Sequence, residues 1–221
     1  ITTNHHGIHL HTSAKSEQVI ISNNSVVSAD YGIIATNARH VVIQGNSLKD
    51  IDFNGITVDG SVYRTGIAIS GNTLRNVGQY GIYIDAQTAN ADGISISGNV
   101  IYDSEKYGIW LRSADTTRTT HVTVTGNTIT RLGSAGWGIY FNLGRNITVT
   151  GNTIDGESSG QYGIISHGAS HSTISGNSVF RVGTSGYSWD TGIYVVAYGA
   201  TRSTYINVTG NRIGWDSSSS T

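Results

Sequence analysis

Apolar and polar residues alternate along most of this chain, in short stretches that end at turns of similar sequence. Residues 94–97 (Ile-Ser-Ile-Ser) and 122–125 (Val-Thr-Val-Thr) are two such stretches, and a Gly-Asn pair follows each of them. Alternation with a period of two residues is typical of a β-strand with one buried face. No stretch has the period of about 3.6 residues that marks an amphipathic helix. The pattern therefore predicts an all-β protein.

The turn is itself a repeat, in which an asparagine usually follows a glycine. The asparagines are 22 to 34 residues apart, at Asn24, Asn46, Asn72, Asn99, Asn127, Asn152, Asn177 and Asn211. Glycine adopts the left-handed backbone conformation of a tight corner without strain, and asparagine tolerates it better than most residues do. We therefore predict a corner at each pair, with asparagines that stack and hydrogen-bond from one repeat to the next.

A second repeat, a Gly-Ile pair, alternates with the first along the chain. Its glycines are Gly7, Gly32, Gly55, Gly81, Gly108, Gly138, Gly163 and Gly192. An apolar residue also lies two positions after each asparagine, for example Leu48, Ile101 and Ile213. Repeats of this length bury their apolar faces against neighbouring repeats, which is the arrangement of a solenoid. We predict a right-handed parallel β-helix of about eight rungs of 22 to 34 residues, with three short strands each, forming one domain over residues 1–221.

The Gly-Asn-Thr-Ile sequences, as at residues 126–129 and 151–154, resemble the repeats of the pectate-lyase-like superfamily of β-helix proteins. Phage tailspike depolymerases and bacterial polysaccharide-processing proteins are the most similar members, and the resemblance covers nearly the whole chain. It implies an extracellular or virion-associated protein that acts on a polysaccharide, and a homotrimer, since tailspikes are commonly trimers. The chain contains no proline, so it lacks the Asp-Pro-His-Glu motif of mannuronan C5-epimerases and the Arg-x-Pro-x-x-Arg motif of pectate lyases.

Composition narrows the choice of partners. The formal net charge is −1 and no basic cluster is present, which argues against nucleic acid and against a polybasic membrane-binding patch. The chain has no cysteine, so it contains no disulfide and no thiolate metal site. It begins within a rung and ends in the polar run 217–220, so we expect a fragment that lacks its N- and C-terminal caps or flanking domains.

If the Gly-Ile strands stack, residues that are the same number of positions after each glycine lie above one another, about 4.8 Å apart, and form a column. The column two positions after the glycine contains Tyr83, Trp110, Tyr140 and Tyr194, and the column four positions after it contains Asp59, Asp85, Arg112, Asn142 and His167. Aromatic rings pack against the C–H faces of sugars, and polar side chains hydrogen-bond their hydroxyls or pair with uronate carboxylates. We therefore predict a glycan groove in which substrate is bound by Tyr83, Trp110, Tyr140, Asn142 and Tyr194. The alternative is that the rings only stack on one another and stiffen the solenoid.

Asp59 and Asp85 form the predicted catalytic pair of this face. The two aspartates occupy equivalent positions in adjacent rungs. Their carboxyl groups would therefore be about 5 to 8 Å apart, the range found in glycosidase acid/base pairs. Repulsion between them would raise the pKa of one carboxyl, which would then act as an acid beside an ionised base or nucleophile. On this hypothesis the protein is a glycoside hydrolase that depolymerises a polysaccharide. Alternatively, the two aspartates begin turns or hold a cation such as Ca²⁺; no other cofactor is indicated.

Arg112 and His167 favour a different reaction on the same face. Arg112 would neutralise a uronate carboxylate while His167 or Tyr83 removes the proton from C5, as in a polysaccharide lyase or epimerase. A third hypothesis is a non-enzymatic solenoid, such as a stalk or adhesin, with no binding surface around Asp59 and Asp85.

Four histidines near the N-terminus, His5, His6, His9 and His11, are a further candidate cluster. His9 and His11 point the same way from one strand and could be metal ligands. Two exposed histidines need a third ligand in the right place, which the sequence does not identify, so we assign no metal.

Overall fold

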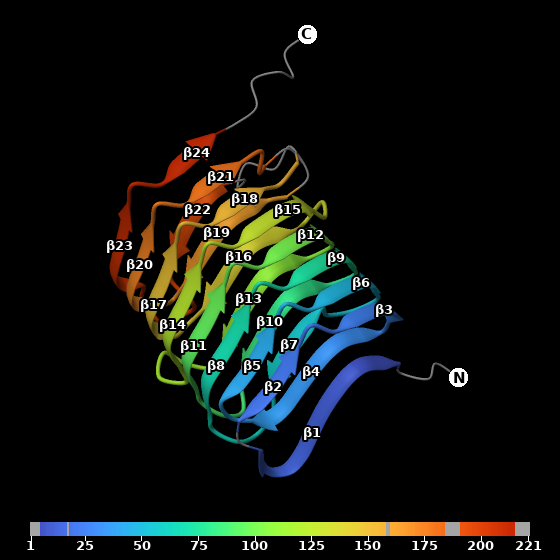
Figure 1. Cartoon of the computed structure of the whole chain (residues 1–221). Coiled ribbons are helices and arrows are strands. Elements are labelled where there is room, and N and C mark those ends of the chain that lie inside the picture. The colour runs from blue at the N-terminus through green and yellow to red at the C-terminus, as the bar shows by residue number, and fades with distance from the viewer. Residues whose placement is uncertain (1–4, 17, 158–159, 184–190, 215–221) are drawn as a thin grey trace.

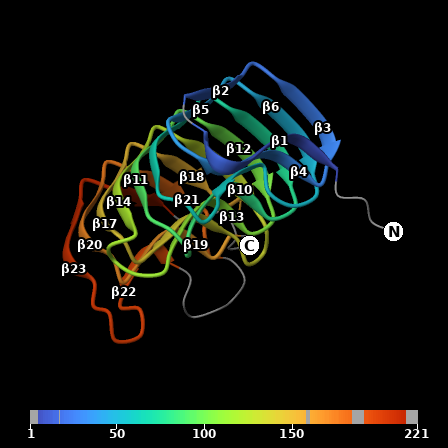
Figure 2. The same cartoon turned by 90° about the horizontal axis from the view of Figure 1, so that it is seen from below.

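The computed structural model describes residues 5–16, 18–157, 160–183 and 191–214. These residues form the predicted right-handed parallel β-helix, in which three sheets of eight strands each enclose a continuous apolar core (Figure 1). Each strand pairs in parallel with its equivalents in the neighbouring rungs, and the first and last rungs lie at opposite ends of the helix (Figures 1 and 2). The described residues contain no helix, and therefore none that could span a membrane.

The sheets are named A, B and C in the order in which the chain visits them. Sheet A contains β1 (His6–Ser16), β4 (Tyr31–Ala38), β7 (Ile56–Asp59), β10 (Tyr80–Ala86), β13 (Tyr107–Ser113), β16 (Trp137–Asn142), β19 (Tyr162–His167) and β22 (Thr191–Val196). Sheet B contains β2 (Val19–Ser22), β5 (Val41–Gln44), β8 (Arg64–Ser70), β11 (Ala91–Ser97), β14 (Thr119–Thr125), β17 (Arg145–Thr150), β20 (Ser170–Ser175) and β23 (Thr204–Thr209). Sheet C contains β3 (Ser25–Ala29), β6 (Ser47–Ile51), β9 (Thr73–Val77), β12 (Val100–Ser104), β15 (Thr128–Leu132), β18 (Thr153–Asp155), β21 (Ser178–Phe180) and β24 (Arg212–Gly214).

Inward-facing aliphatic residues fill the core in continuous columns. The isoleucine after the glycine is fully buried in six consecutive rungs, at Ile33, Ile56, Ile82, Ile109, Ile139 and Ile164. The predicted column behind the asparagines is also buried from Leu48 to Val179. Ile213 departs from the prediction, with 46% of its surface exposed, because no described rung covers it.

The predicted asparagine ladder is present and runs from Asn24 to Asn211. In the middle of the ladder, the backbone N–H and the side-chain Nδ2 of Asn99 both donate to Oδ1 of Asn127, at 3.0 and 2.9 Å. The same Nδ2 donates to the backbone oxygen of Ile69 at 3.0 Å. Each buried amide therefore joins its own rung to the rungs on either side. The glycine before it is left-handed, as predicted, for example Gly98 at φ 61°.

The glycines of the Gly-Ile pairs have a different physical role. They are not left-handed, but they lie where adjacent rungs approach one another most closely. A Cβ atom on Gly81 would be 2.5 Å from the backbone oxygen of Gly108 and 2.8 Å from Cγ2 of Ile101. Only glycine fits such a contact, so this column fixes the close approach of sheet A to sheet C at every rung.

Replacing Asn99 by alanine should lower the free energy of unfolding by about 3 kcal/mol, since a buried carbonyl (Ile69) and a buried N–H (Asn72) would lose their partners. Urea unfolding followed by circular dichroism measures the loss. Asn24→Ala is the matched control at the first position of the ladder, where no described rung precedes it, and should lower stability by less than half as much. Equal losses would contradict a ladder that acts through both neighbours.

Candidate functional site

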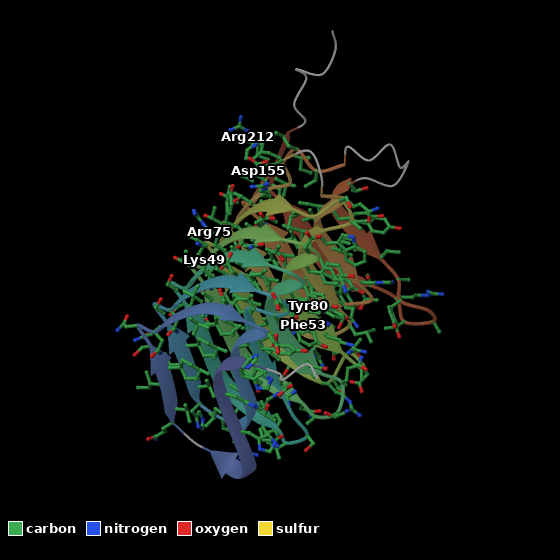
Figure 3. The ribbon with its side chains drawn as sticks, turned by 90° about the vertical axis from the view of Figure 1, so that its right-hand side faces the viewer. Lys49, Phe53, Arg75, Tyr80, Asp155 and Arg212 are labelled. Carbon is green, nitrogen blue, oxygen red and sulfur yellow. The ribbon has the colours of Figure 1, made fainter. Side chains whose placement is uncertain are left out.

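Aromatic rings dominate the outer face of sheet A in two adjacent columns. The columns are Tyr80, Tyr107 and Trp137 at the start of the strands, and Tyr83, Trp110 and Tyr140 beside them. Ring centroids within the second column are 4.8 and 6.0 Å apart, and Trp110 also meets Tyr80 edge to face at 4.8 Å. Tyr80 is labelled in Figure 3, away from the charged side chains that follow the edge formed by sheet C. The rings therefore contact one another from rung to rung.

This stacking changes how the predicted aromatic residues could bind a sugar. Only 8% of the surface of Tyr83 and of Tyr140 is exposed, because neighbouring rings cover their faces. Their hydroxyl groups, in contrast, take part in a polar network at the surface. The aromatic columns thus stiffen the solenoid, and the groups they offer to a ligand in the middle rungs are hydroxyls and ring edges.

Asp85 and Arg112 meet at the hydroxyl of Tyr83. The Tyr83 hydroxyl donates to Oδ2 of Asp85 at 2.9 Å and accepts from Nη1 of Arg112 at 3.1 Å, while Nη1 lies 3.8 Å from Oδ2. Burial raises the pKa of Tyr83 well above its usual range, so the phenol stays protonated and can only donate a proton. The hydrogen bond to Tyr83 is the largest cause of a raised pKa at Arg112. The three groups form one connected cluster over two rungs.

Asp59 and Asp85 follow paired segments of adjacent strands, but their carboxylates have different partners. The paired segments are Ile56–Val58 of β7 and Ile82–Ile84 of β10. Oδ1 of Asp59 accepts a hydrogen bond of 2.7 Å from Thr36, on the preceding rung. Asp85 interacts instead with its own rung and the following one. The predicted pair therefore belongs to two polar groups that extend in opposite directions along the helix.

A fully buried arginine, Arg64, lies under this part of the face. Its guanidinium donates to the backbone oxygens of Gly60, at 2.5 Å, and of Asp85. Burial lowers the pKa of Arg64, and the charges of Asp59 and Asp85 partly offset this effect. Since a buried cation needs nearby negative charge, the two aspartates also have a structural role that any mutational test must separate from catalysis.

A hollow of about 400 Å³ opens on sheet A beside Asp59, at the N-terminal end of the face. Its walls are formed by His6, His9, His11, Tyr31, Ile34, Thr36, Asn54, Thr57, Asp59 and Tyr83. Burial, and then the charges of His6 and His11, lower the pKa of His9, so this imidazole is neutral and can accept a proton near neutral pH. The hollow thus combines a neutral base, a carboxylate and a protonated phenol.

Sequence reasoning missed the polar floor of this hollow. Asn54 is only 7% exposed; its Nδ2 donates to Oγ1 of Thr57 at 3.1 Å, and its Oδ1 has no partner among the described residues. The signal was available, because Asn54 and Thr57 occupy columns that are aromatic in the next three rungs. Small polar residues there leave the space that rings fill elsewhere.

The remaining predicted residues lie farther along the face. Trp110 donates through Nε1 to Oδ1 of Asn142 at 3.2 Å, and Asn142 is buried with its Nδ2 bonded to the backbone of Ser113. His167 lies one rung beyond Asn142, with Nδ1 3.3 Å from the hydroxyl of Tyr140. Arg112 and His167 are therefore two rungs, about 10 Å, apart and make no direct contact.

Sheet C also carries a charged column, but its charges compensate one another. Lys49, Arg75, Asp155 and Arg212 follow the helix axis in Figure 3. Arg181 pairs with Asp155 at 2.5 Å, Lys49 lies 3.6 Å from the carboxylate of Asp50, and the guanidinium of Arg75 lies 5.0 Å from the ring centre of Tyr102. These contacts stabilise the rung stack.

The histidine cluster does not form a metal site in the described ranges. Nδ1 of His6 and Nδ1 of His9 are 3.0 Å apart, but no group of three or more His, Cys, Asp or Glu side chains is arranged to hold an ion in the residues that the structure describes. His6, His9 and His11 contribute to the hollow instead.

Comparison with protein families gives one match that spans the chain. Residues 1–154 and 89–221 each match the model of the family described as periplasmic copper-binding protein (NosD). Comparison with curated protein sequences gave no match.

Solved structures of the same fold include an alginate lyase, a tailspike protein and an alginate epimerase. An alginate lyase from Paenibacillus sp. str. FPU-7 is 17% identical, with a TM-score of 0.66 over 91% of this chain and 73% of the lyase. The Dettilon tailspike protein is 14% identical, with a TM-score of 0.62 over 90% of this chain and 48% of the tailspike. The periplasmic alginate epimerase AlgG is 16% identical, with a TM-score of 0.54 over 87% of this chain and 49% of the epimerase. The chain thus spans about half the length of the tailspike and the epimerase, and the likeness establishes the fold.

The family description names copper, but the donor atoms of this chain do not fit a built copper site. The sequence has neither cysteine nor methionine, which are the soft ligands that select copper(I). Imidazole also binds copper, yet the described histidines do not assemble with a third donor. No step of the chemistry considered below involves a metal.

Replacing His167 by glutamine should flatten the pH dependence of stability. Burial lowers the pKa of His167, so the unfolded chain takes up a proton at a higher pH than the folded chain does. This contribution is complete above the unfolded pKa of about 6.5 and is lost as the pH falls through that value. The wild type should therefore lose more unfolding free energy than the variant between about pH 7.5 and about pH 5, measured by urea unfolding at each pH. Equal losses would contradict a buried, neutral His167.

Proposed function

The chain belongs to the NosD family, and we propose that it is a polysaccharide-active β-helix that binds a glycan along the outer face of sheet A. The proposed chemistry is proton transfer on a uronate, of the lyase or epimerase type, in the hollow beside Asp59. One observation carries the proposal: a single hollow on sheet A is lined by His9, Asp59 and Tyr83. A neutral imidazole and a protonated phenol are a matched base and acid.

The roles follow from the protonation states. His9 accepts the proton from C5 of the uronate, and the electron pair forms a double bond between C4 and C5 as the C4–O bond breaks. Tyr83 exchanges its hydrogen bond to Asp85 for one to the departing glycosidic oxygen and gives that oxygen its proton. Arg112, hydrogen-bonded to the same hydroxyl at 3.1 Å, stabilises the resulting phenolate. Asn54 and His11 bind the uronate carboxylate. Return of a proton to the opposite face of C5, without loss of the C4 substituent, would give epimerisation.

Three comparisons support this choice without specifying an activity. A lyase, an epimerase and a tailspike share the fold, so β-helices of this kind carry out chemistry on polysaccharides. The family description contains the word periplasmic, which supports a location outside the cytoplasm, in the periplasm, at the cell surface or on a virion. A homotrimer stays a prediction.

Hydrolysis by Asp59 and Asp85 is the second candidate, because these carboxylates follow equivalent positions of adjacent strands. We rank it second since Asp85 already shares its carboxylate with Tyr83, Arg112 and the backbone of Gln87. A glycosidase acid or nucleophile must instead present a free oxygen to the sugar.

A screen of uronic-acid polymers, bacterial capsules and O-antigens, followed by reducing ends and ultraviolet absorbance together, tests both candidates. We expect absorbance from the unsaturated product of a lyase, and a loss of about 10²- to 10⁴-fold in kcat/KM for His9→Asn and for Tyr83→Phe. His171→Asn is the matched control, because His171 lies on β20 of sheet B, where it stacks on Tyr205.

The other outcomes identify the alternatives. Reducing ends without absorbance, abolished by Asp85→Asn in a variant that stays folded by circular dichroism, would establish hydrolysis and overturn the lyase proposal. Full activity of His9→Asn would remove His9 from the mechanism. If no polymer gave reducing ends or ultraviolet absorbance, the non-enzymatic solenoid would be favoured.

A further inference from the structure

The second aromatic column of sheet A is interrupted near its C-terminal end. Rings occupy this column in three consecutive rungs, at Tyr83, Trp110 and Tyr140, and again at Tyr194. Between the last two, the position belongs to Ile165, which is 3% exposed. An isoleucine is shorter than a tyrosine, so the face lacks one ring at this rung.

A small slot lies at the interruption. It has a volume of about 100 Å³ and is lined by Trp137, Tyr162, Ile165, His167, Tyr194 and Val196. Tyr162 and Tyr194 stack with their centroids 5.7 Å apart, and Trp137 meets Tyr162 edge to face at 5.5 Å. Aromatic walls therefore surround a space that an aromatic side chain fills in the preceding rungs.

We propose that this slot is a sugar-binding subsite, in which the apolar face of one neutral pyranose takes the place of the missing ring. A pyranose with equatorial hydroxyls presents a flat face of C–H groups, which packs against an aromatic ring as another ring edge does. The hydroxyls at its rim would reach the solvent and the imidazole of His167. The inference rests on the proposed function, since it requires a glycan that lies along sheet A.

The charge of the lining selects against a uronate in this position. None of the six lining side chains is a lysine, arginine, aspartate or glutamate. The imidazole of His167 also brings no positive charge near neutral pH, because burial lowers its pKa. A uronate carboxylate in the slot would lose water without gaining a cation or a side-chain amide, which is unfavourable. The hollow differs, because it offers the amide of Asn54 and, through the hydroxyl of Tyr83, the neighbouring Arg112. The preferred polymer therefore carries a neutral sugar several rungs away from the uronate bound in the hollow.

Saturation-transfer NMR and calorimetry with two probes test the subsite. The probes are cellohexaose, whose hydroxyls are all equatorial, and a mannuronate oligomer of the same length. We expect saturation transfer to the axial ring protons of cellohexaose, and we expect the mannuronate, which binds in the hollow, to keep its affinity when the slot is changed. Ile165→Tyr completes the aromatic column and should weaken cellohexaose binding at least about tenfold. Tyr194→Ala, which removes a wall, should weaken it by a similar factor.

Thr130→Tyr is the matched control, because it adds the same ring on β15 of sheet C, away from the slot. It should leave both affinities unchanged. The subsite would be overturned if the wild type and both slot variants bound cellohexaose equally, or if cellohexaose showed no saturation transfer. In either case, cleavage of a polymer would still support the proposed function. A loss of mannuronate affinity in Ile165→Tyr as large as the loss of cellohexaose affinity would overturn the selectivity of the slot for a neutral sugar. Absence of both cleavage and probe binding would overturn both proposals.

Discussion

Hydrogen bonds between stacked, buried asparagines hold the rungs of this β-helix in register. From Asn46 to Asn177, each ladder asparagine contributes an amide that donates to the next asparagine and to a backbone oxygen of an earlier rung, as Asn99 does with Asn127 and Ile69. These groups are buried, so a shift of one rung by a single residue would leave several of them without partners. Loops between sheets can vary in length, because the ladder restores the register at every turn.

Register has a direct consequence for the outer surface. Side chains at equivalent positions of neighbouring rungs are forced into contact. Aromatic residues therefore form stacks in which each ring packs against the ring of the next rung. The hollow and the slot arise where a column is interrupted. The hollow exists because Ile34 and Thr57 precede the ring of Tyr83, and the slot exists because Ile165 follows the ring of Tyr140. In this solenoid, departures from the repeat carry more functional information than the repeat itself.

The buried guanidinium of Arg64 links the corner of the helix to the candidate chemistry. It binds backbone oxygens at the start and the end of the loops that follow Asp59 and Asp85. Its charge is partly offset by the two carboxylates above it. The same aspartates can therefore stabilise the corner and take part in the polar network.

The amino-acid sequence by itself determined the fold, the corners and the inward columns, because a two-residue alternation and a regular Gly-Asn repeat permit only one way to bury the apolar residues. It also placed the aromatic and polar columns together on one face of sheet A, since register follows from the repeat. What it did not determine is which polar groups meet. Asp59 turned to Thr36 and Asp85 to Arg112, while His9 joined the hollow. Side-chain partners depend on rotamers, burial and the space left by neighbouring rungs, and only the tertiary structure decides these.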